Sequence, residues 1–248
     1  MKLALLADIH ANLEALAACL AHAGEQGAER HAFLGDLVGY GADPAAVVDL
    51  VQAHASRGAI VVRGNHDQAA LEGESETMNQ AAEQAIAWTR ARLSDGQRAF
   101  LSGLPLLARE GDMVFVHASA DAPSRWIYVS DPLRAAHSLE AAAGASYVFS
   151  GHVHEPVLYF TGQAARPVAF RPVPGVPIPV SPRRRWLAIV GAAGQPRDGN
   201  TAACYALLDT ERATLTFQRV PYDWQAAAAK VRAAGLPVRL ARRLAQGE

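Results

Sequence analysis

Cysteine is scarce in this chain, which has only Cys19 and Cys204 among its 248 residues. The two lie far apart in the sequence, and neither belongs to a Cys-x-x-Cys pair of the kind that binds zinc or exchanges disulfides. A chain of this length also does not need a disulfide in order to fold. We therefore expect two buried free thiols and no thiolate metal site.

Long apolar runs and an excess of either charge are missing as well. The apolar run from Lys2 to Ala7 stops at Asp8 and is far too short for a signal sequence or a membrane span. Lysine and arginine number 23 against 24 aspartates and glutamates, so the formal net charge of -1 gives no overall attraction to nucleic acid or anionic membranes. We expect a soluble, cytoplasmic protein with no membrane partner and no stable nucleic-acid complex.

Hydrophobic residues, by contrast, make up 50% of the chain, which is enough for a sizeable core and favours a single domain over residues 1–248. Up to residue 154, short apolar runs alternate with amphipathic stretches, as in a parallel sheet with helical crossovers. One of these helices is expected to begin at a capping box at Thr77. From 157 to 220, β-type runs separated by prolines predict a second, mostly antiparallel sheet. Two helices are expected to follow it.

Polar residues that suit metal ions follow nearly every apolar run of the first part. They are Asp8 and His10, Asp36, Asn65 and His66, His117, and His152 and His154. In open α/β sheets ligands gather at the carboxyl ends of strands, so the residues after the first three runs are expected along one rim. Carboxylates, an amide and imidazoles without a thiolate are what a pair of divalent transition metals needs. The sequence therefore predicts a two-metal site.

Five ordered motifs carry a family resemblance. They are Asp8-Ile-His10, Gly35-Asp-Leu-Val38, Gly64-Asn-His-Asp67, the strand-borne His117 and Gly151-His-Val-His154. This set resembles the calcineurin-like metallophosphoesterase superfamily, and Gly35 to Gly41 with Gly194 to Asp198 is similar to its bacterial and archaeal phosphodiesterase or diadenosine-tetraphosphatase-like branch. The resemblance implies an α/β fold, a four-layer α/β/β/α sandwich in which two mixed β-sheets are flanked by helices. After Asp8-Ile-His10 the family usually has glycine, where this chain has Ala11.

The resemblance also implies a role for each residue. One metal ion would be held by Asp8, His10 and His154, the other by Asn65, His117 and His152, and both by Asp36. His66 would face the substrate as a catalytic residue with Asp67 beside it as an orienting partner, and Asn65, His66 and Arg197 would contact the substrate. Manganese is favoured, although iron, nickel, cobalt, zinc and magnesium tolerate the same ligands.

The expected reaction is hydrolysis of a phosphodiester in a small phosphorylated substrate, with nucleotides and phosphomonoesters as candidates. A hydroxide shared by the two metal ions would attack phosphorus. His66 would either protonate the leaving group or donate a hydrogen bond to a non-bridging oxygen, and the residues leave both roles open.

Other residues near the motifs allow more than one interpretation. For Arg197, a contact to a substrate phosphate and an ion pair with Asp198 in solvent are equal alternatives. The loop from 118 to 131, with Arg125, Trp126 and Tyr128, is a candidate lip over the site, with ordinary packing as the alternative. The arginines between 239 and 243 are expected on a solvated face.

Two other functions share the core motifs. A protein Ser/Thr phosphatase is disfavoured, because that branch resembles Gly-Asp-x-Val-Asp-Arg-Gly and Gly-Asn-His-Glu, whereas this chain has Gly39-Tyr-Gly41 and Asp67. A non-catalytic scaffold on the same fold ranks lower still, since such scaffolds lack part of the ligand set and the histidine that is present here as His66. The physiological substrate and the oligomeric state follow from no pattern that we can identify.

Overall fold

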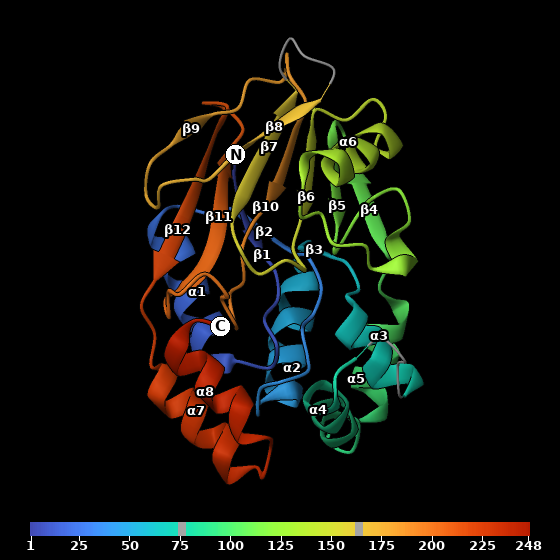
Figure 1. Ribbon diagram of the computed structural model, residues 1–248, viewed down its shortest axis with the longest axis vertical. Coiled ribbons are helices and arrows are strands. Elements are labelled where there is room, and N and C mark those ends of the chain that lie inside the picture. Colours follow the sequence, from blue (N-terminus) through green and yellow to red (C-terminus); the bar gives the residue numbers. More distant parts are fainter. Residues whose placement is uncertain (74–77, 162–165) are drawn as a thin grey trace.

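Two six-stranded β-sheets form the centre of the computed structural model, which describes all residues except 74–77 and 162–165 (Figure 1). The first sheet has the order β3 (Ile60–Val61), β2 (Arg30–Phe33), β1 (Lys2–Leu6), β11 (Ala203–Asp209), β12 (Thr214–Val220) and β9 (Ile178–Pro179). The second has the order β4 (Leu107–Glu110), β5 (Met113–Val116), β6 (Tyr147–Ser150), β10 (Trp186–Ile189), β7 (Val157–Thr161) and β8 (Pro167–Phe170). Both sheets are mixed: β1, β2 and β3 run parallel, as do β5, β6 and β10, and the remaining pairs are antiparallel.

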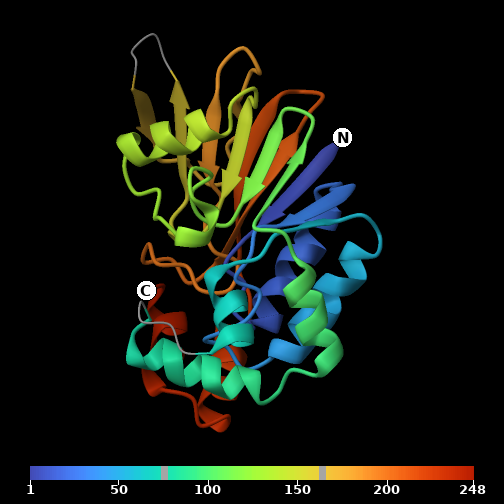
Figure 2. The same cartoon turned by 90° about the vertical axis from the view of Figure 1, so that its right-hand side faces the viewer.

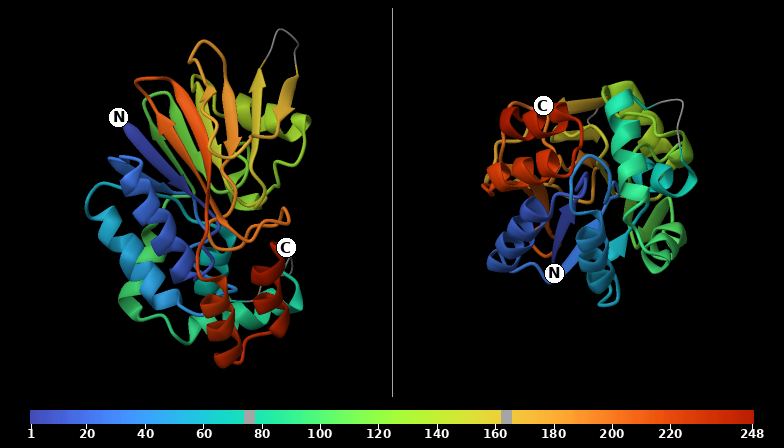
Figure 3. Two further views of the ribbon diagram at one scale, coloured as in Figure 1. Left: turned by 90° about the vertical axis from the view of Figure 1, so that its left-hand side faces the viewer. Right: turned by 90° about the horizontal axis from the view of Figure 1, so that it is seen from below.

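Helices cover both outer faces of this pair of sheets. Helices α1 (Leu13–Glu25) and α2 (Pro44–Ala55) pack on the first sheet, and α6 (Pro132–Ala141) packs on the second (Figures 2 and 3). The predicted four-layer α/β/β/α sandwich is therefore confirmed. The other α-helices lie at the lower end in Figure 1 and are α3 (Asn65–Glu72), α4 (Gln80–Arg90), α5 (Asp95–Gly103), α7 (Trp224–Ala233) and α8 (Val238–Gln246). A short 3-10 helix spans Pro123–Arg125.

The strand β1 is buried on both faces, as its continuous apolar sequence predicts. Leu3 and Leu5 point into the core between the two sheets, where they join Phe115, Phe149 and other side chains. Because side chains alternate along a strand, the residues between them pack against the helices instead. Each such leucine or phenylalanine stabilises the fold by about 1.5–3 kcal/mol. The predicted ligands that follow β1 are therefore attached to a strand that is packed on both faces.

The strands between residues 157 and 220 do not form a sheet of their own, and this prediction is wrong. β7, β8 and β10 extend the second sheet beyond β6, whereas β9, β11 and β12 extend the first sheet beyond β1. In the first sheet β11 pairs antiparallel with β1, and in the second β10 pairs parallel with β6. An alternating pattern of apolar and polar residues indicates a strand. Which strand it pairs with depends on the free edges of the sheets that are already formed.

Several smaller expectations can be compared with the structure. Cys19 and Cys204 are buried and free, as predicted. The proposed helix start at Thr77 lies outside the described residues; α4 begins at Gln80, and the side chain of Asn79 caps it by accepting from the backbone N–H of Ala82. Every described helix is too short or too polar to cross a bilayer.

Candidate metal centre

Loops that follow strands of both sheets meet at one place and are tied together by backbone hydrogen bonds. The N–H of His10 donates to the carbonyl of Asp36 at 2.9 Å, which joins the loops after β1 and β2. In the second sheet the N–H of Gly151 donates to the carbonyl of His117 at 2.9 Å. The carboxylate of Asp8 links the two sheets, since its oxygens accept from the N–H of His152 at 2.9 and 3.1 Å. The polar residues predicted from the strand ends therefore gather from opposite sheets.

These residues form two clusters of ligand atoms that match the predicted sets, and a third, overlapping group joins His10 and Asp36 to His66. In the first, the ligand atoms of Asp8, His10 and His154 all lie within 4.8 Å of one another. In the second, those of Asp36, His117 and His152 do the same. Nε2 of His117 is also 3.1 Å from Oδ1 of Asn65. The structure thus brings together the two groups of side chains that the resemblance implies.

Asp36 lies between the two clusters. Its Oδ2 is 3.7 Å from Nε2 of His10 in the first cluster and 3.3 Å from Nε2 of His117 in the second. Its Oδ1 accepts a hydrogen bond from the N–H of His66 at 2.8 Å, which orients the carboxylate. Asp36 is therefore placed to bridge two ions. Asp8 also spans the clusters, with its Oδ1 3.4 Å from Nε2 of His154 and 4.0 Å from Nε2 of His117.

The four clustered imidazoles each place one ring nitrogen against a backbone carbonyl. The pairs are His10 Nδ1 with Val38 at 3.2 Å, His117 Nδ1 with Leu34 at 2.7 Å, His154 Nδ1 with Gln195 at 2.6 Å and His152 Nε2 with Trp126 at 3.0 Å. A carbonyl only accepts, so that nitrogen carries the hydrogen, and in the neutral ring the other nitrogen turns a lone pair toward the cluster.

These lone pairs meet in pairs inside the clusters. Nε2 of His10 is 3.1 Å from Nε2 of His154, and Nε2 of His117 is 3.1 Å from Nδ1 of His152. Two neutral acceptors cannot satisfy each other by a hydrogen bond, whereas a cation between them satisfies both. This donor set therefore fits two divalent metal ions.

Burial and charge set the protonation states in the second cluster. Burial raises the pKa of the Asp36 carboxyl, but the imidazoles of His117 and His66 outweigh it and hold that pKa well below its usual range. Burial lowers the pKa of His117, yet the charge of Asp36 and its hydrogen bond raise it to about 9. Burial and the charge of His117 lower the pKa of His152 to about 3. The buried Asp36 carboxylate therefore favours positive charge beside it, which a divalent cation bound between Asp36 and the neutral His117 ring would supply.

The backbone of the site is strained. Five of the seven predicted ligands have a left-handed backbone, with φ of 53° at Asp8, 50° at His10, 52° at Asp36, 68° at His152 and 66° at His154. Such a conformation costs about 1–3 kcal/mol for a residue with a Cβ, and it concentrates at functional sites. Ala11 also has φ of 51°, a left-handed conformation that glycine adopts without strain and that suits the glycine which the family resemblance implies here.

His66 lies in the first turn of α3, because the Gly-Asn-His-Asp stretch begins that helix instead of forming a loop. Its ring is 4% exposed and lies between His10, 4.8 Å away between ring centres, and Tyr40, at 4.4 Å. Within the described part of the chain its Nδ1 has no hydrogen-bond partner. Burial lowers the pKa of this imidazole to about 4. Its neighbours orient the ring by packing.

Asp67 does not make the expected contact with His66. Its Oδ1 accepts from the backbone N–H groups of Leu37 and Val38 at 2.9 and 3.2 Å, and its Oδ2 accepts from that of Gly64 at 2.9 Å. Both oxygens are therefore committed to backbone donors. Asp67 ties the loop after β2 to the start of α3, and so positions Asp36 and His66 through the main chain.

A cavity of about 290 Å³ opens beside the second cluster. Its lining includes Asn65, His66 and His152, the aromatic residues Tyr40, Trp126 and Tyr128, the guanidinium-bearing Arg125, and Met78, Asn79 and Ala82 around the start of α4. The loop from 118 to 131 is therefore part of this cavity. It also touches a predicted ligand directly, since the Tyr128 ring stacks on His152 with centres 3.9 Å apart.

Arg197 lies next to the site and is not paired with Asp198. Asp198 instead forms an ion pair with Arg219 of β12. Nη2 of Arg197 donates to Oε1 of Gln195 at 3.0 Å, and its guanidinium carbon lies 5.8 Å from the centre of the Tyr40 ring. The solvent ion pair considered from the sequence is thereby excluded.

Sequence reasoning missed three residues at this rim. Tyr40 packs on both His10 and His66, Gln195 accepts from Arg197, and Arg243 of α8 reaches the same Gln195 oxygen at 3.5 Å. Only Tyr40, an aromatic inside a glycine-rich loop, had a local signal. Arg243 was expected on a solvated face and is half-buried instead, because α8 folds back onto the loop that carries Gln195.

Known proteins resemble this chain over most of its length. A family model described as the calcineurin-like phosphoesterase superfamily domain matches residues 1–213. An uncharacterized protein of Methanocaldococcus jannaschii is 31% identical over 250 residues, which cover 99% of this chain and 98% of that protein. The crystal structure of a metallophosphoesterase from Sphaerobacter thermophilus superposes with a TM-score of 0.90 at 36% identity, covering 100% of this chain and 99% of the other. A hypothetical protein from Pyrococcus horikoshii OT3 has a TM-score of 0.79 at 18% identity, with 100% and 98% covered, which is a likeness of fold.

Proposed function

This chain belongs to the calcineurin-like phosphoesterase superfamily, and on that basis we propose that it is a dinuclear metal-dependent phosphoesterase. The proposed substrate is a small phosphodiester, with nucleotides and phosphomonoesters as candidates. The observation that carries the proposal is the position of Asp36, whose Oδ2 lies within 4 Å of an imidazole nitrogen in each cluster. A carboxylate in such a position can contact two ions at once.

The proposed ligand sets follow the two clusters. Asp8, His10 and His154 would hold the first ion, Asn65, His117 and His152 the second, and Asp36 both. When bound, two divalent ions lower the pKa of a coordinated water and neutralise phosphoryl oxygens, which is the chemistry that phosphoester hydrolysis requires. Manganese is the favoured metal, as the mixture of oxygen and imidazole donors accepts it readily.

His66 is the proposed hydrogen-bond donor to the substrate. Its ring lines the cavity next to Asn65. An imidazole in that place can donate to the leaving oxygen or to a non-bridging phosphoryl oxygen. Tyr40, which packs against the ring at 4.4 Å, would keep it aimed at the cavity.

The aromatic lining of the cavity supports a substrate with a planar group. Trp126 and Tyr128 of the lip line it with aromatic rings, the largely buried Tyr40 contributes to the same lining, and Arg125 adds a positive charge. Such rings stack on any nucleobase without hydrogen-bond readout. A nucleotide ester therefore matches the lining better than an alkyl phosphate does.

The test combines elemental analysis with hydrolysis of bis(p-nitrophenyl) phosphate in the presence of manganese. We expect two metal ions per chain and metal-dependent release of p-nitrophenol. The Asp36→Asn variant should lose both bound metal and nearly all turnover, because one carboxylate serves both ions. Asp112→Asn, which changes an exposed aspartate far from the clusters, is the matched control. A fully metal-loaded Asp36→Asn protein, or a metal-loaded wild type without esterase activity, would overturn the proposal.

A further inference from the structure

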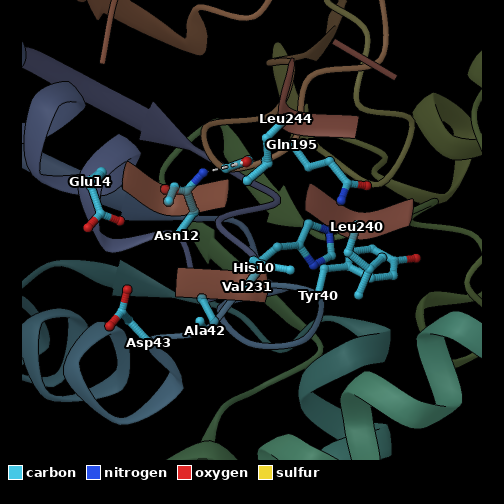
Figure 4. A pocket seen from close by; sticks show the side chains of 14 residues that line it. His10, Asn12, Glu14, Tyr40, Ala42, Asp43, Gln195, Val231, Leu240 and Leu244 are labelled. Carbon is cyan, nitrogen blue, oxygen red and sulfur yellow. Dashed lines mark hydrogen bonds between the residues drawn. The ribbon is translucent and has the colours of Figure 1, made fainter. Parts of the chain in front are cut away.

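Two arginines from distant parts of the chain meet beside Tyr40. Arg197 belongs to the loop after β10, and Arg243 belongs to the last turn of α8. Both donate to the same atom, Oε1 of Gln195, from Nη2 of Arg197 at 3.0 Å and from Nη1 of Arg243 at 3.5 Å. Figure 4 shows Gln195, Tyr40 and His10 close together, next to Leu240 of α8. The two guanidinium groups are thus neighbours at the edge of the metal centre.

Neither positive charge is neutralised by a residue of the described ranges. Among the described residues no carboxylate lies within ion-pair distance of Arg197 or Arg243. Their shared partner is a neutral amide oxygen, whereas each guanidinium offers five N–H donors. Burial, and after it the charge of Arg197, holds the pKa of Arg243 below its usual value. Two partly buried like charges with unused donors are arranged for an anion.

The pair lies one aromatic ring away from the predicted metal ligands. The Tyr40 ring centre is 4.5 Å from that of His10 on one side, and the guanidinium carbon of Arg197 is 5.8 Å from it. The backbone N–H of Arg197 also donates to the carbonyl of His154 at 3.4 Å. A substrate with its scissile phosphate at the metal centre would therefore need only a short chain to bring a further anionic group to the two arginines.

We propose that Arg197 and Arg243 form a subsite for a second phosphate of the substrate, as in a nucleoside polyphosphate. The inference rests on the proposed function and deepens it by naming a substrate class. Arginine suits this task because its planar fork can bind two phosphate oxygens at once. Arg243 lies beyond residues 1–213, which match the family model, so the C-terminal helix adds a contact that the matched domain does not contain.

Two chromogenic esters distinguish recognition of a further phosphate from recognition of the scissile one. Thymidine 5′-(p-nitrophenyl phosphate) carries one phosphate, and the γ-p-nitrophenyl ester of thymidine triphosphate carries two more; both release p-nitrophenol. With free manganese held constant, the wild type should favour the triphosphate ester in kcat/KM by about 10- to 100-fold, the typical range for charge-assisted contacts. Arg243→Gln should remove most of this preference, mainly by raising KM for the triphosphate ester. It should change kcat/KM for the monophosphate ester by no more than about twofold.

Arg242→Gln is the matched control, because it removes the same charge from the next, exposed position of α8. The preference for the triphosphate ester should survive in this variant. Equal loss in Arg242→Gln would indicate a general surface-charge effect, and equal loss of both esters in Arg243→Gln would indicate a purely structural role. Either result overturns the subsite, as does a wild type that hydrolyses both esters equally well, although the phosphoesterase proposal would then stand.

If neither ester is hydrolysed, the proposed function fails. The subsite can then still be tested by measuring anion binding. Sodium sulfate should raise the Tm of the wild type and of Arg242→Gln above the value in sodium chloride of equal ionic strength. The gain should be clearly smaller in Arg243→Gln, because sulfate binds the native state through that guanidinium. An identical gain in all three proteins would show that Arg243 binds no anion.

Discussion

At the residue scale, His66 is the side chain with which a loss of catalysis can be distinguished from a loss of metal binding. It lies beside the clusters but is absent from both proposed ligand sets, and its ring contacts Tyr40 and His10 through packing. Asp36, by contrast, touches both clusters. Substitutions of these two neighbours should therefore differ in metal content.

We expect His66→Ala to retain two metal ions and to lose about 100- to 10,000-fold in kcat, the usual contribution of a positioned proton donor. The loss should be smaller for a p-nitrophenyl ester than for a phenyl ester, because the better leaving group needs less help from a proton. Elemental analysis and kcat on the two esters measure this. His137→Ala removes an exposed histidine of α6 and serves as the control. Full activity in a metal-loaded His66→Ala protein would rule out the proposed role.

At the element scale, the lip from 118 to 131 does more than border the cavity. The carbonyl of Trp126 faces Nε2 of His152 at 3.0 Å, and the ring of Tyr128, although 51% exposed, stacks on the same imidazole. Outer contacts of this kind orient a ligating histidine. The lip thus links the cavity to the second cluster.

We predict that Tyr128→Ala weakens metal binding by about 10-fold at the second cluster, the lower end of the range for outer contacts to a ligand. It should also raise KM for aromatic esters, because one stacking surface is lost. Tyr128→Phe keeps the ring and should keep both properties, which makes it the control. Manganese titration and steady-state kinetics give the answer, and unchanged manganese affinity in Tyr128→Ala would show that the stack is incidental.

The contact between β2 and α2 carries a pH-sensitive pair outside the site. The rings of His31 and His54 meet edge to face with centres 4.7 Å apart. Burial, His54 and Arg57 lower the pKa of His31 to about 4, and burial and Arg57 also lower that of His54. The folded values lie below the unfolded value of about 6.5, so the unfolded state binds more protons in this window. Stability should therefore fall as the pH drops from about 6.5 toward 4.

His31→Phe should reduce this acid sensitivity, since a phenyl ring cannot be protonated. The fall in Tm between pH 7.5 and pH 5 should be smaller in the variant, by the equivalent of about 1 kcal/mol, because His31 is only partly buried. His137→Phe, at an exposed site on α6, should behave like the wild type. If Tm falls by the same amount between pH 7.5 and pH 5 in the wild type and in His31→Phe, the histidine pair does not control the acid response.

At the scale of the whole molecule, the proposed metal centre joins the two sheets. Its ligands follow β1, β2 and β3 in the first sheet and β5 and β6 in the second, so bound ions would cross-link the layers. Five of these ligands also have a left-handed backbone, whose cost the bound state must offset. The fold and the centre should therefore depend on each other.

Removal of the metals with a chelator should lower Tm on the order of 10 °C. A ligand present at about 1,000 times its Kd contributes about 4 kcal/mol, and each kcal/mol shifts Tm by about 2–4 °C in a chain of this size. Added manganese should restore Tm, and Asp36→Asn should show no chelator effect. The single domain over residues 1–248 remains a prediction, and one cooperative transition in the same scans would agree with it. A Tm that is independent of the chelator in a protein shown to carry two ions would contradict the link.

The sequence by itself determined where the strands end and which polar residues follow them. Short apolar runs bounded by glycines and metal-type side chains are local patterns, so Asp8, Asp36, Asn65 and His117 could be placed at strand ends without a structure. The order of the motifs then indicated the family and the four-layer fold. The roles of the individual ligands remain proposals.

Only the tertiary structure decided which distant segments became neighbours. It divided the strands after residue 157 between both sheets, and it turned Asp67 toward backbone donors instead of His66. It also brought Arg243 of the last helix to Arg197. The physical reason is that strand pairing, hydrogen-bond geometry and helix docking depend on free edges and donors supplied from elsewhere in the chain, and no local pattern encodes those.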